Sequence, residues 1–212
     1  MTHALSIVGT DQLTQLVLAT SVMTRFRGVP EHLINMHSFW RHGISAGLVA
    51  RAMASINGEY NAERFFVGGL LHDVGRLVMC LKAPDQLRRA MELVQKGELL
   101  YKQERRVFGY DHADVGGELL RQWNLPFRLQ ESIRCHHKPQ RATNYADEAA
   151  LINLADAISH SLDLGNSGES GVPPLKEKSW ELVGLDEETY LPQIQDKVRK
   201  QFDEVVQVFL HG

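Results

Sequence analysis

The chain has 212 residues, of which 43% are apolar and 23% charged, and its formal net charge is −3. This size and apolar content suffice for one sizeable hydrophobic core, so we expect a single domain over residues 1–212. The slightly acidic balance gives no reason to expect a nucleic-acid partner, because nucleic-acid phosphates are usually bound by a distinctly basic surface.

The sequence carries no sign of export or of membrane insertion. Its first residues lack the basic region and apolar run of a signal peptide, and no segment approaches the roughly 20 apolar residues of a membrane span. The two cysteines, Cys80 and Cys135, have no spacing that suggests a disulfide framework or a zinc knuckle. We therefore expect a cytoplasmic protein with reduced thiols and no membrane partner.

Apolar residues recur with a period near 3.6 along almost the whole chain, and no alternating run is long enough to suggest a sheet. The predicted fold class is therefore all-α. Capping residues, glycines and prolines divide this pattern into helices over 11–26, 39–55, 61–81, from 84 onward, 111–123, 126–137, 146–164 and 187–210. The stretch 165–179 is predicted as an internal loop, because it is rich in glycine and serine over 165–171 and has two prolines at 173 and 174.

An adjacent pair, His72 and Asp73, lies inside the apolar stretch 61–81. A buried imidazole beside a buried carboxylate needs a physical reason, and a bound metal ion is the obvious one. Further candidate ligands occur in other predicted helices: His42, His112, His136, His137 and Asp156. Imidazole nitrogen and carboxylate oxygen together suit iron, manganese, zinc or nickel better than calcium.

These seven residues can be divided between one or two divalent ions. A carboxylate can bridge two ions where an imidazole cannot, so Asp73 is the predicted bridging ligand. In this interpretation one metal position is completed by His42, His72 and Asp156. The other is supplied by His112, His136 and His137.

Simpler interpretations apply to the other histidines, because a lone histidine in a helix is more often a core or surface residue than a ligand. This applies to His3, His32, His37, His160 and His211. Among them His37 is the rival of His42 as the upstream ligand, and His160, four residues after Asp156, could form a hydrogen-bonded pair with it.

Arg76 follows His72 by four residues, so both would lie on the same face of a continuous helix. We predict that Arg76 binds a phosphate or another anion. The alternative is a surface cation whose aliphatic stem packs on the protein and whose charge reaches solvent.

Several strings resemble the HDOD domain, an HD-related output domain of bacterial signalling proteins. They are Phe-Trp-Arg-His at 39–42, Gly-Gly-Leu-Leu-His-Asp-Val-Gly-Arg-Leu at 68–77, Tyr-Asp-His-Ala-Asp-Val-Gly-Gly at 110–117, Trp-Asn-Leu-Pro at 123–126 and Ile-Arg-Cys-His-His-Lys-Pro at 133–139. The resemblance covers nearly the whole chain and implies an HD-domain-like multi-helix bundle. The opening of the chain resembles a segment that lies well inside this domain. We therefore expect the family's N-terminal helical lobe to be missing, and oligomerisation through the N-terminal helices.

The resemblance implies a signal-transduction output module that acts by binding a signalling protein partner, with a retained His/Asp metal site. The alternative is a metal-dependent phosphohydrolase, similar to the HD-GYP phosphodiesterases, with a nucleotide or cyclic dinucleotide as ligand. Two departures favour the binding module. Arg76 stands where those phosphodiesterases carry lysine, and no Gly-Tyr-Pro signature follows the paired histidines, where the chain continues Lys-Pro-Gln-Arg-Ala over 138–142.

Overall fold

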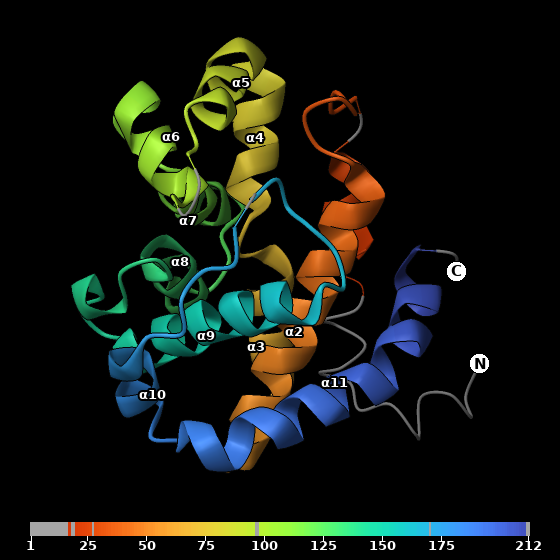
Figure 1. Ribbon diagram of the computed structural model, residues 1–212, viewed down its shortest axis with the longest axis vertical. Coiled ribbons are helices and arrows are strands. Elements are labelled where there is room, and N and C mark those ends of the chain that lie inside the picture. Colours follow the sequence, from red (N-terminus) through yellow and green to blue (C-terminus); the bar gives the residue numbers. More distant parts are fainter. Residues whose placement is uncertain (1–16, 18–19, 27, 96–97, 170, 211–212) are drawn as a thin grey trace.

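The computed structural model describes residues 17, 20–26, 28–95, 98–169 and 171–210 (Figure 1). Within these ranges the chain forms helices and no strands, which confirms the all-α prediction. The helices are α2 (Met36–Ile56), α3 (Glu63–Leu71), α4 (Val74–Lys82), α5 (Pro84–Glu92), α6 (Leu100–Phe108), α7 (His112–Gln122), α8 (Phe127–Cys135), α9 (Ala146–Leu162), α10 (Glu177–Val183) and α11 (Glu187–Leu210), with a 3-10 turn at Pro139–Arg141. No helix in the described ranges is long and apolar enough to cross a membrane.

The core is built around α2, α3 and α9, and α2 and α9 are buried along most of their length. Glycines allow α2 and α3 to approach closely. A Cβ atom at Gly69 would lie 2.5 Å from the carbonyl group of Ala46, and one at Gly47 would lie 2.7 Å from the carbonyl oxygen of Phe66. This backbone contact brings His42 of α2 beside His72 at the end of α3.

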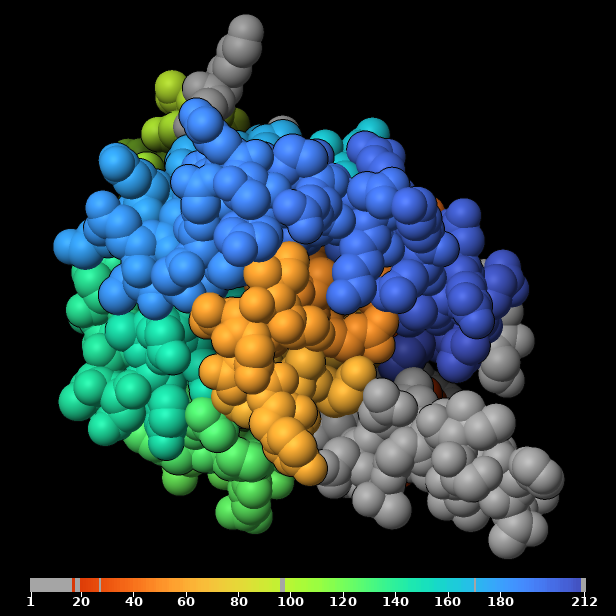
Figure 2. All heavy atoms as spheres, turned by 90° about the horizontal axis from the view of Figure 1, so that it is seen from below, coloured from red at the N-terminus to blue at the C-terminus, as the bar shows by residue number. Residues whose placement is uncertain are grey.

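The remaining helices surround this core. In Figure 1, α4, α5 and α6 gather at one end of the molecule, while α11 runs across the opposite end. Buried side chains of α11, including Val198 and Phe202, pack towards α2. Figure 2 shows α11 (blue) beside the end of α2 and the start of α3 (orange), where the rings of Phe66 and Phe209 lie 5.6 Å apart.

The predicted continuous helix over 61–81 is wrong, because the chain bends at His72 and Asp73 between α3 and α4. The bend lets α4 pack closely against α7. A Cβ atom at Gly75 would lie 2.0 Å from the carbonyl oxygen of His112, so the two backbones are in direct contact. Apolar periodicity continues through both helices and does not reveal the break.

Other boundaries also differ from the prediction. Helix α2 begins at Met36 because the side chain of Asn35 caps it, accepting a hydrogen bond of 2.8 Å from the N–H of Ser38. Helix α6 and the 3-10 turn were not predicted, and α10 starts inside the expected loop 165–179. Of the predicted helix 11–26, residues 17 and 20–25 are helical. The expected loss of the N-terminal lobe and the expected oligomerisation concern a segment that lies largely outside the described residues. His3 and His211 also lie outside them.

Glu131 of α8 clamps the connection to α9. Its carboxylate accepts hydrogen bonds from the backbone N–H groups of Thr143, Asn144 and Tyr145, at 3.1, 2.9 and 2.9 Å. Burial alone would raise the pKa of Glu131, but these bonds to the charged form hold it below its usual value of 4.5. The ionised carboxylate therefore stabilises the folded chain above about pH 4.5, and this contribution is lost as the pH falls below that value.

We expect Glu131→Gln to lower the free energy of unfolding by about 1–3 kcal/mol at pH 7, because three backbone donors lose a charged acceptor. The difference from the wild type should shrink between pH 5 and pH 3. Urea denaturation at several pH values measures both effects. The exposed Glu92→Gln is the matched control. An equal loss of unfolding free energy in both variants at pH 7 would contradict a stabilising role of the Glu131 carboxylate.

Candidate metal centre

The structure brings together the seven predicted ligands in two adjacent groups. The first group contains His42 from α2, His72 and Asp73 from the α3–α4 bend, and Asp156 from α9. One ligand atom from each of these residues lies within 4.8 Å of those from the others. All four side chains are buried, with at most 5% of each residue exposed.

Nitrogen and oxygen atoms alternate within this first group. The Nε2 atom of His42 lies 3.2 Å from Oδ1 of Asp156. The Nε2 atom of His72 lies 3.3 Å from Oδ2 of Asp73 and 3.4 Å from Oδ1 of Asp156. Two imidazoles and two carboxylates therefore face one another across a space of the size a metal ion would occupy.

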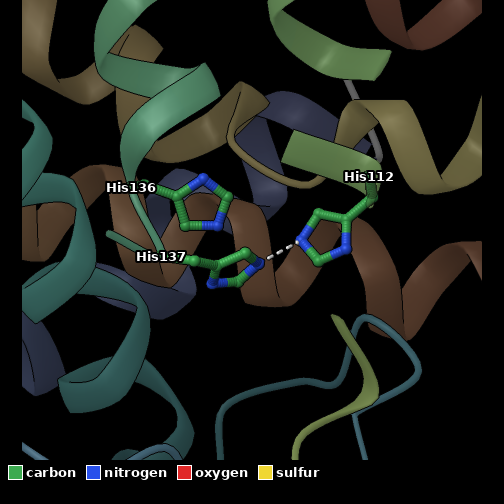
Figure 3. Close-up of side chains that lie close together, drawn as sticks. All are labelled: His112, His136 and His137. Atoms are coloured by element: carbon green, nitrogen blue, oxygen red, sulfur yellow. Dashed lines mark hydrogen bonds between the residues drawn. The ribbon is translucent and has the colours of Figure 1, made fainter. Parts of the chain in front are cut away.

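The second group contains His112, His136 and His137 (Figure 3). His112 is the first residue of α7, and the pair His136 and His137 follows the end of α8. Figure 3 shows the paired histidines facing His112, with Nε2 of His137 only 2.9 Å from Nε2 of His112. The close approach of two ring nitrogens leaves room for at most one proton between them.

Asp73 connects the two groups. Its Oδ1 atom lies 2.8 Å from Nε2 of His112, and its Oδ2 atom lies 3.3 Å from Nε2 of His72. This is the arrangement expected of the bridging carboxylate predicted from the sequence. Binding of ions here stays a prediction.

Hydrogen bonds orient three of the imidazoles towards the centre. The Nδ1 atoms of His72 and His136 each donate to the backbone carbonyl three residues earlier, at 2.6 and 2.7 Å. The Nδ1 atom of His112 donates to the carboxylate of Glu104 at 2.6 Å. The Nε2 atoms of His72 and His136 are buried and have no hydrogen-bond partner among the described residues. Buried nitrogens oriented in this way by a second layer of acceptors are typical of metal ligands, so the residues present fit a divalent ion.

The two aspartates stay ionised at neutral pH. Burial alone would raise the pKa of Asp73, but the Arg76 guanidinium and the His72 imidazole hold it well below its usual value. For Asp156 the same burial effect is overcome by hydrogen bonds from His160 and His42. Ionised carboxylates are the form that binds metal.

The buried histidines differ in their protonation state at neutral pH. Burial lowers the pKa of His42 to about 4 and that of His136 to about 3, so both are neutral. Burial also disfavours the charged form of His72, but the neighbouring carboxylates outweigh it and raise the pKa of His72 to about 10. A metal ion binding here would release the proton of His72, because a ligating imidazole nitrogen must be unprotonated.

Arg76 lies in the interior beside Asp73. Only 2% of its surface is exposed, so the interpretation as a surface cation is wrong. Its Nη1 atom donates to Oδ2 of Asp73 at 3.1 Å and to Oγ of Ser167 at 2.8 Å, and its Nε atom donates to Glu104 at 3.1 Å. Anion binding by Arg76 stays a prediction, and it would require some of these bonds to break.

His160 and His37, the two other histidines considered beside the predicted ligands, lie in different environments. His160 belongs to the edge of the first group, where its Nε2 atom lies 3.3 Å from Oδ1 of Asp156 and its ring centroid 4.3 Å from that of His42. It forms the paired arrangement that the sequence left open. His37 is exposed and belongs to neither group.

The loop 165–176, described except for residue 170, lies over the centre, and the sequence did not reveal this role. Ser167 is fully buried against Arg76, and Glu169, 6% exposed, accepts a hydrogen bond of 2.9 Å from the N–H of Leu100 at the start of α6. A Cβ atom at Gly165 would lie 2.4 Å from the backbone nitrogen of His42, so the loop rests directly on α2. Glycine- and serine-rich composition is typical of surface loops and gave no signal of this burial.

A small cavity of about 10 Å³ remains between the loop and the candidate ligands. Its lining includes Asp73, Asp156 and His137 from the centre, and Ser167 and Glu169 from the loop. This volume accepts about one water-sized group. The space beside the candidate ligands is therefore too small for a larger molecule in this structure.

Comparison with solved structures shows a shared fold. An HDOD domain protein of unknown function from Geobacter sulfurreducens aligns over 95% of this chain and 72% of its own, with 23% identity and a TM-score of 0.77. A protein of Shewanella amazonensis SB2B named "Putative phosphohydrolase" aligns over 97% and 75%, with 21% identity and a TM-score of 0.78. A "Putative signal transduction protein" of Marinobacter aquaeolei VT8 aligns over 95% and 45%, with 20% identity and a TM-score of 0.73.

Sequence comparison agrees with this fold. An uncharacterized protein of Treponema pallidum (strain Nichols) is 24% identical over 127 residues, which are 58% of this chain. The match spans only 25% of that relative's length. The HDOD domain family matches residues 1–139, which include six of the seven candidate metal ligands, all except Asp156. The chain therefore belongs to the HDOD domain family.

Proposed function

We propose that this protein is a regulatory output module of bacterial signal transduction, holding one or two divalent ions and acting through binding of a signalling protein partner. The observation that carries the proposal is the small volume, about 10 Å³, of the cavity beside the candidate ligands. Pockets for nucleotides and similar ligands usually measure hundreds of cubic ångströms. An ion fits between the ligands, whereas a nucleotide does not fit into the cavity.

The ligands come from parts of the fold that are far apart in the sequence. They belong to α2, the α3–α4 bend, α7, the end of α8 and α9. An ion of iron, manganese, zinc or nickel held by this set would join these elements and add its binding free energy to the stability of the fold. This supports a structural role for the metal in a protein that acts through its surface.

A metal-dependent phosphohydrolase is the second candidate, and the bridging position of Asp73 favours it. Two ions that share a carboxylate are a common hydrolytic arrangement, and they would supply Lewis-acid activation of water and of a phosphoryl oxygen. In this case the loop 165–176 would have to move to admit the substrate. Arg76 would then exchange its bond to Ser167 for a phosphate oxygen.

Turnover assays on the metal-loaded protein distinguish the two candidates. We expect no phosphate release or diester cleavage from cyclic dinucleotides, nucleotide mono-, di- and triphosphates above the level seen with Asp73→Asn, because substrates cannot reach the ions. The exposed Asp203→Asn serves as the matched control. Hydrolysis that disappears in Asp73→Asn and persists in Asp203→Asn would overturn the proposal in favour of the phosphohydrolase.

A further inference from the structure

A second, larger cavity shares His137 with the small cavity beside the candidate ligands. This groove of about 220 Å³ is formed by residues of α6, α7, the end of α8 and the 3-10 turn Pro139–Arg141. His137 lines both the groove and the small cavity. The groove is also lined by four cationic side chains: Arg105, Arg134, Lys138 and Arg141.

The two acidic residues of the groove share one of its cations. Arg105 donates to Oδ2 of Asp111 at 2.7 Å and to Oδ2 of Asp114 at 2.8 Å. The same two aspartates form the capping box at the start of α7, accepting hydrogen bonds from backbone N–H groups. Arg105 and this acidic pair therefore form a unit with a net charge of −1, so the four cations and two aspartates that line the groove give it a net charge of +2.

Three cations remain to attract an anion. Arg134 has a carboxylate only at 3.7 Å, from Glu118, and both side chains of that pair are 43% exposed. Lys138 and Arg141 form no ion pair within the described part of the chain. Lys138 precedes the 3-10 turn and Arg141 ends it, and both residues line the groove. Positive charge is thus concentrated here, in a chain whose net charge is −3.

We propose that this groove binds the diphosphate group of a small phosphorylated molecule, of the nucleoside diphosphate class. Arginine guanidinium groups bind phosphate oxygens through paired N–H donors, and lysine adds a compact charge. The volume of the groove accepts a diphosphate with part of the attached group, whereas the cavity of about 10 Å³ beside the candidate ligands does not. A role of this ligand as the signal read by the module rests on the proposed function, but its binding does not require a metal.

Cys135 provides a direct probe of the groove. It lines the groove, while the only other cysteine of the chain, Cys80, is fully buried. The experiment measures the rate at which a thiol-specific reagent modifies Cys135 in chelator-treated protein, with and without inorganic pyrophosphate at low ionic strength. We expect pyrophosphate to slow the modification severalfold, and calorimetry to show saturable binding of one pyrophosphate per chain.

A pair of matched variants tests the assignment. We expect the double variant Lys138→Ala, Arg141→Ala to lose both the protection of Cys135 and the calorimetric signal. The control, Arg88→Ala with Arg89→Ala, removes the same charge from the exposed face of α5 and should retain both. Circular dichroism verifies that each variant is folded.

Two results would overturn the proposal. One is a modification rate that pyrophosphate does not change in the wild type. The other is equal protection in both double variants, which would show a diffuse attraction of anions instead of a site. Because the protein is free of metal throughout, either failure leaves the proposed metal-holding module untouched, and a failure of metal binding leaves the groove untouched.

Discussion

Replacing Arg76 by alanine will lower the free energy of unfolding by about 3–5 kcal/mol, because removal of one partner leaves buried opposite charges uncompensated. The guanidinium is 2% exposed and donates to Asp73 and Glu104 at 3.1 Å each, and to Ser167 at 2.8 Å. Its Nη2 atom also lies 2.9 Å from Nδ1 of His112. Without it, the buried carboxylates of Asp73 and Glu104 have only histidines to neutralise them.

Urea denaturation in the presence of a chelator measures this loss without a contribution from metal binding. Arg76→Lys should retain part of the stability, since it keeps the charge but cannot reach all three partners at once. The exposed Arg88→Ala should lie within about 0.5 kcal/mol of the wild type. An Arg76→Ala protein as stable as Arg88→Ala would show that the buried network contributes nothing.

Divalent metal will raise the melting temperature of the chelator-treated protein. At a free metal concentration of about 100 times Kd, binding to the folded state adds about 2.7 kcal/mol, which corresponds to roughly 5–11 °C for a chain of this size. Manganese, iron, zinc and nickel are the ions to compare. Elemental analysis of protein purified without chelator gives the number of ions bound.

Variants of the ligands locate the ions. Asp73→Asn should abolish the thermal shift, because Asp73 contacts both groups. Asp156→Asn should weaken metal binding in the first group only. His136→Gln removes a buried nitrogen that lacks a partner in the described structure. His32→Gln, on the surface, should behave as the wild type. Protein that contains no ion and shows no shift with any of the four metals would refute the metal centre.

Most of the helical architecture followed from the sequence. The 3.6-residue apolar period predicted an all-α chain, and capping and breaking residues placed most helix ends, as at Asp111 before α7 and Pro139 after α8. The failures were helices that gave a weak or ambiguous signal. The period continues through His72 and Asp73, so α3 and α4 were predicted as one helix, and the short α6 and α10 were not predicted.

The residues of the candidate centre could be named from their chemical type and from their place in apolar helices, but not from distances between them. Glu104 is a lone glutamate in a polar helix, and nothing in the sequence marks it as the acceptor that orients His112. Similarly, Ser167 lies in a segment whose composition is typical of an exposed loop, yet it is fully buried.

The sequence by itself determined the fold class, the family and the set of His and Asp residues available to a metal, because periodicity and residue chemistry are local properties. Only the tertiary structure decided that Asp73 joins two groups, that Arg76 is neutralised inside the protein and that the loop 165–176 narrows the space beside the centre. These features depend on contacts between segments far apart in the chain, such as the 91 residues that separate Arg76 from Ser167. Packing of backbone on backbone at Gly69, Gly75 and Gly165 sets those contacts.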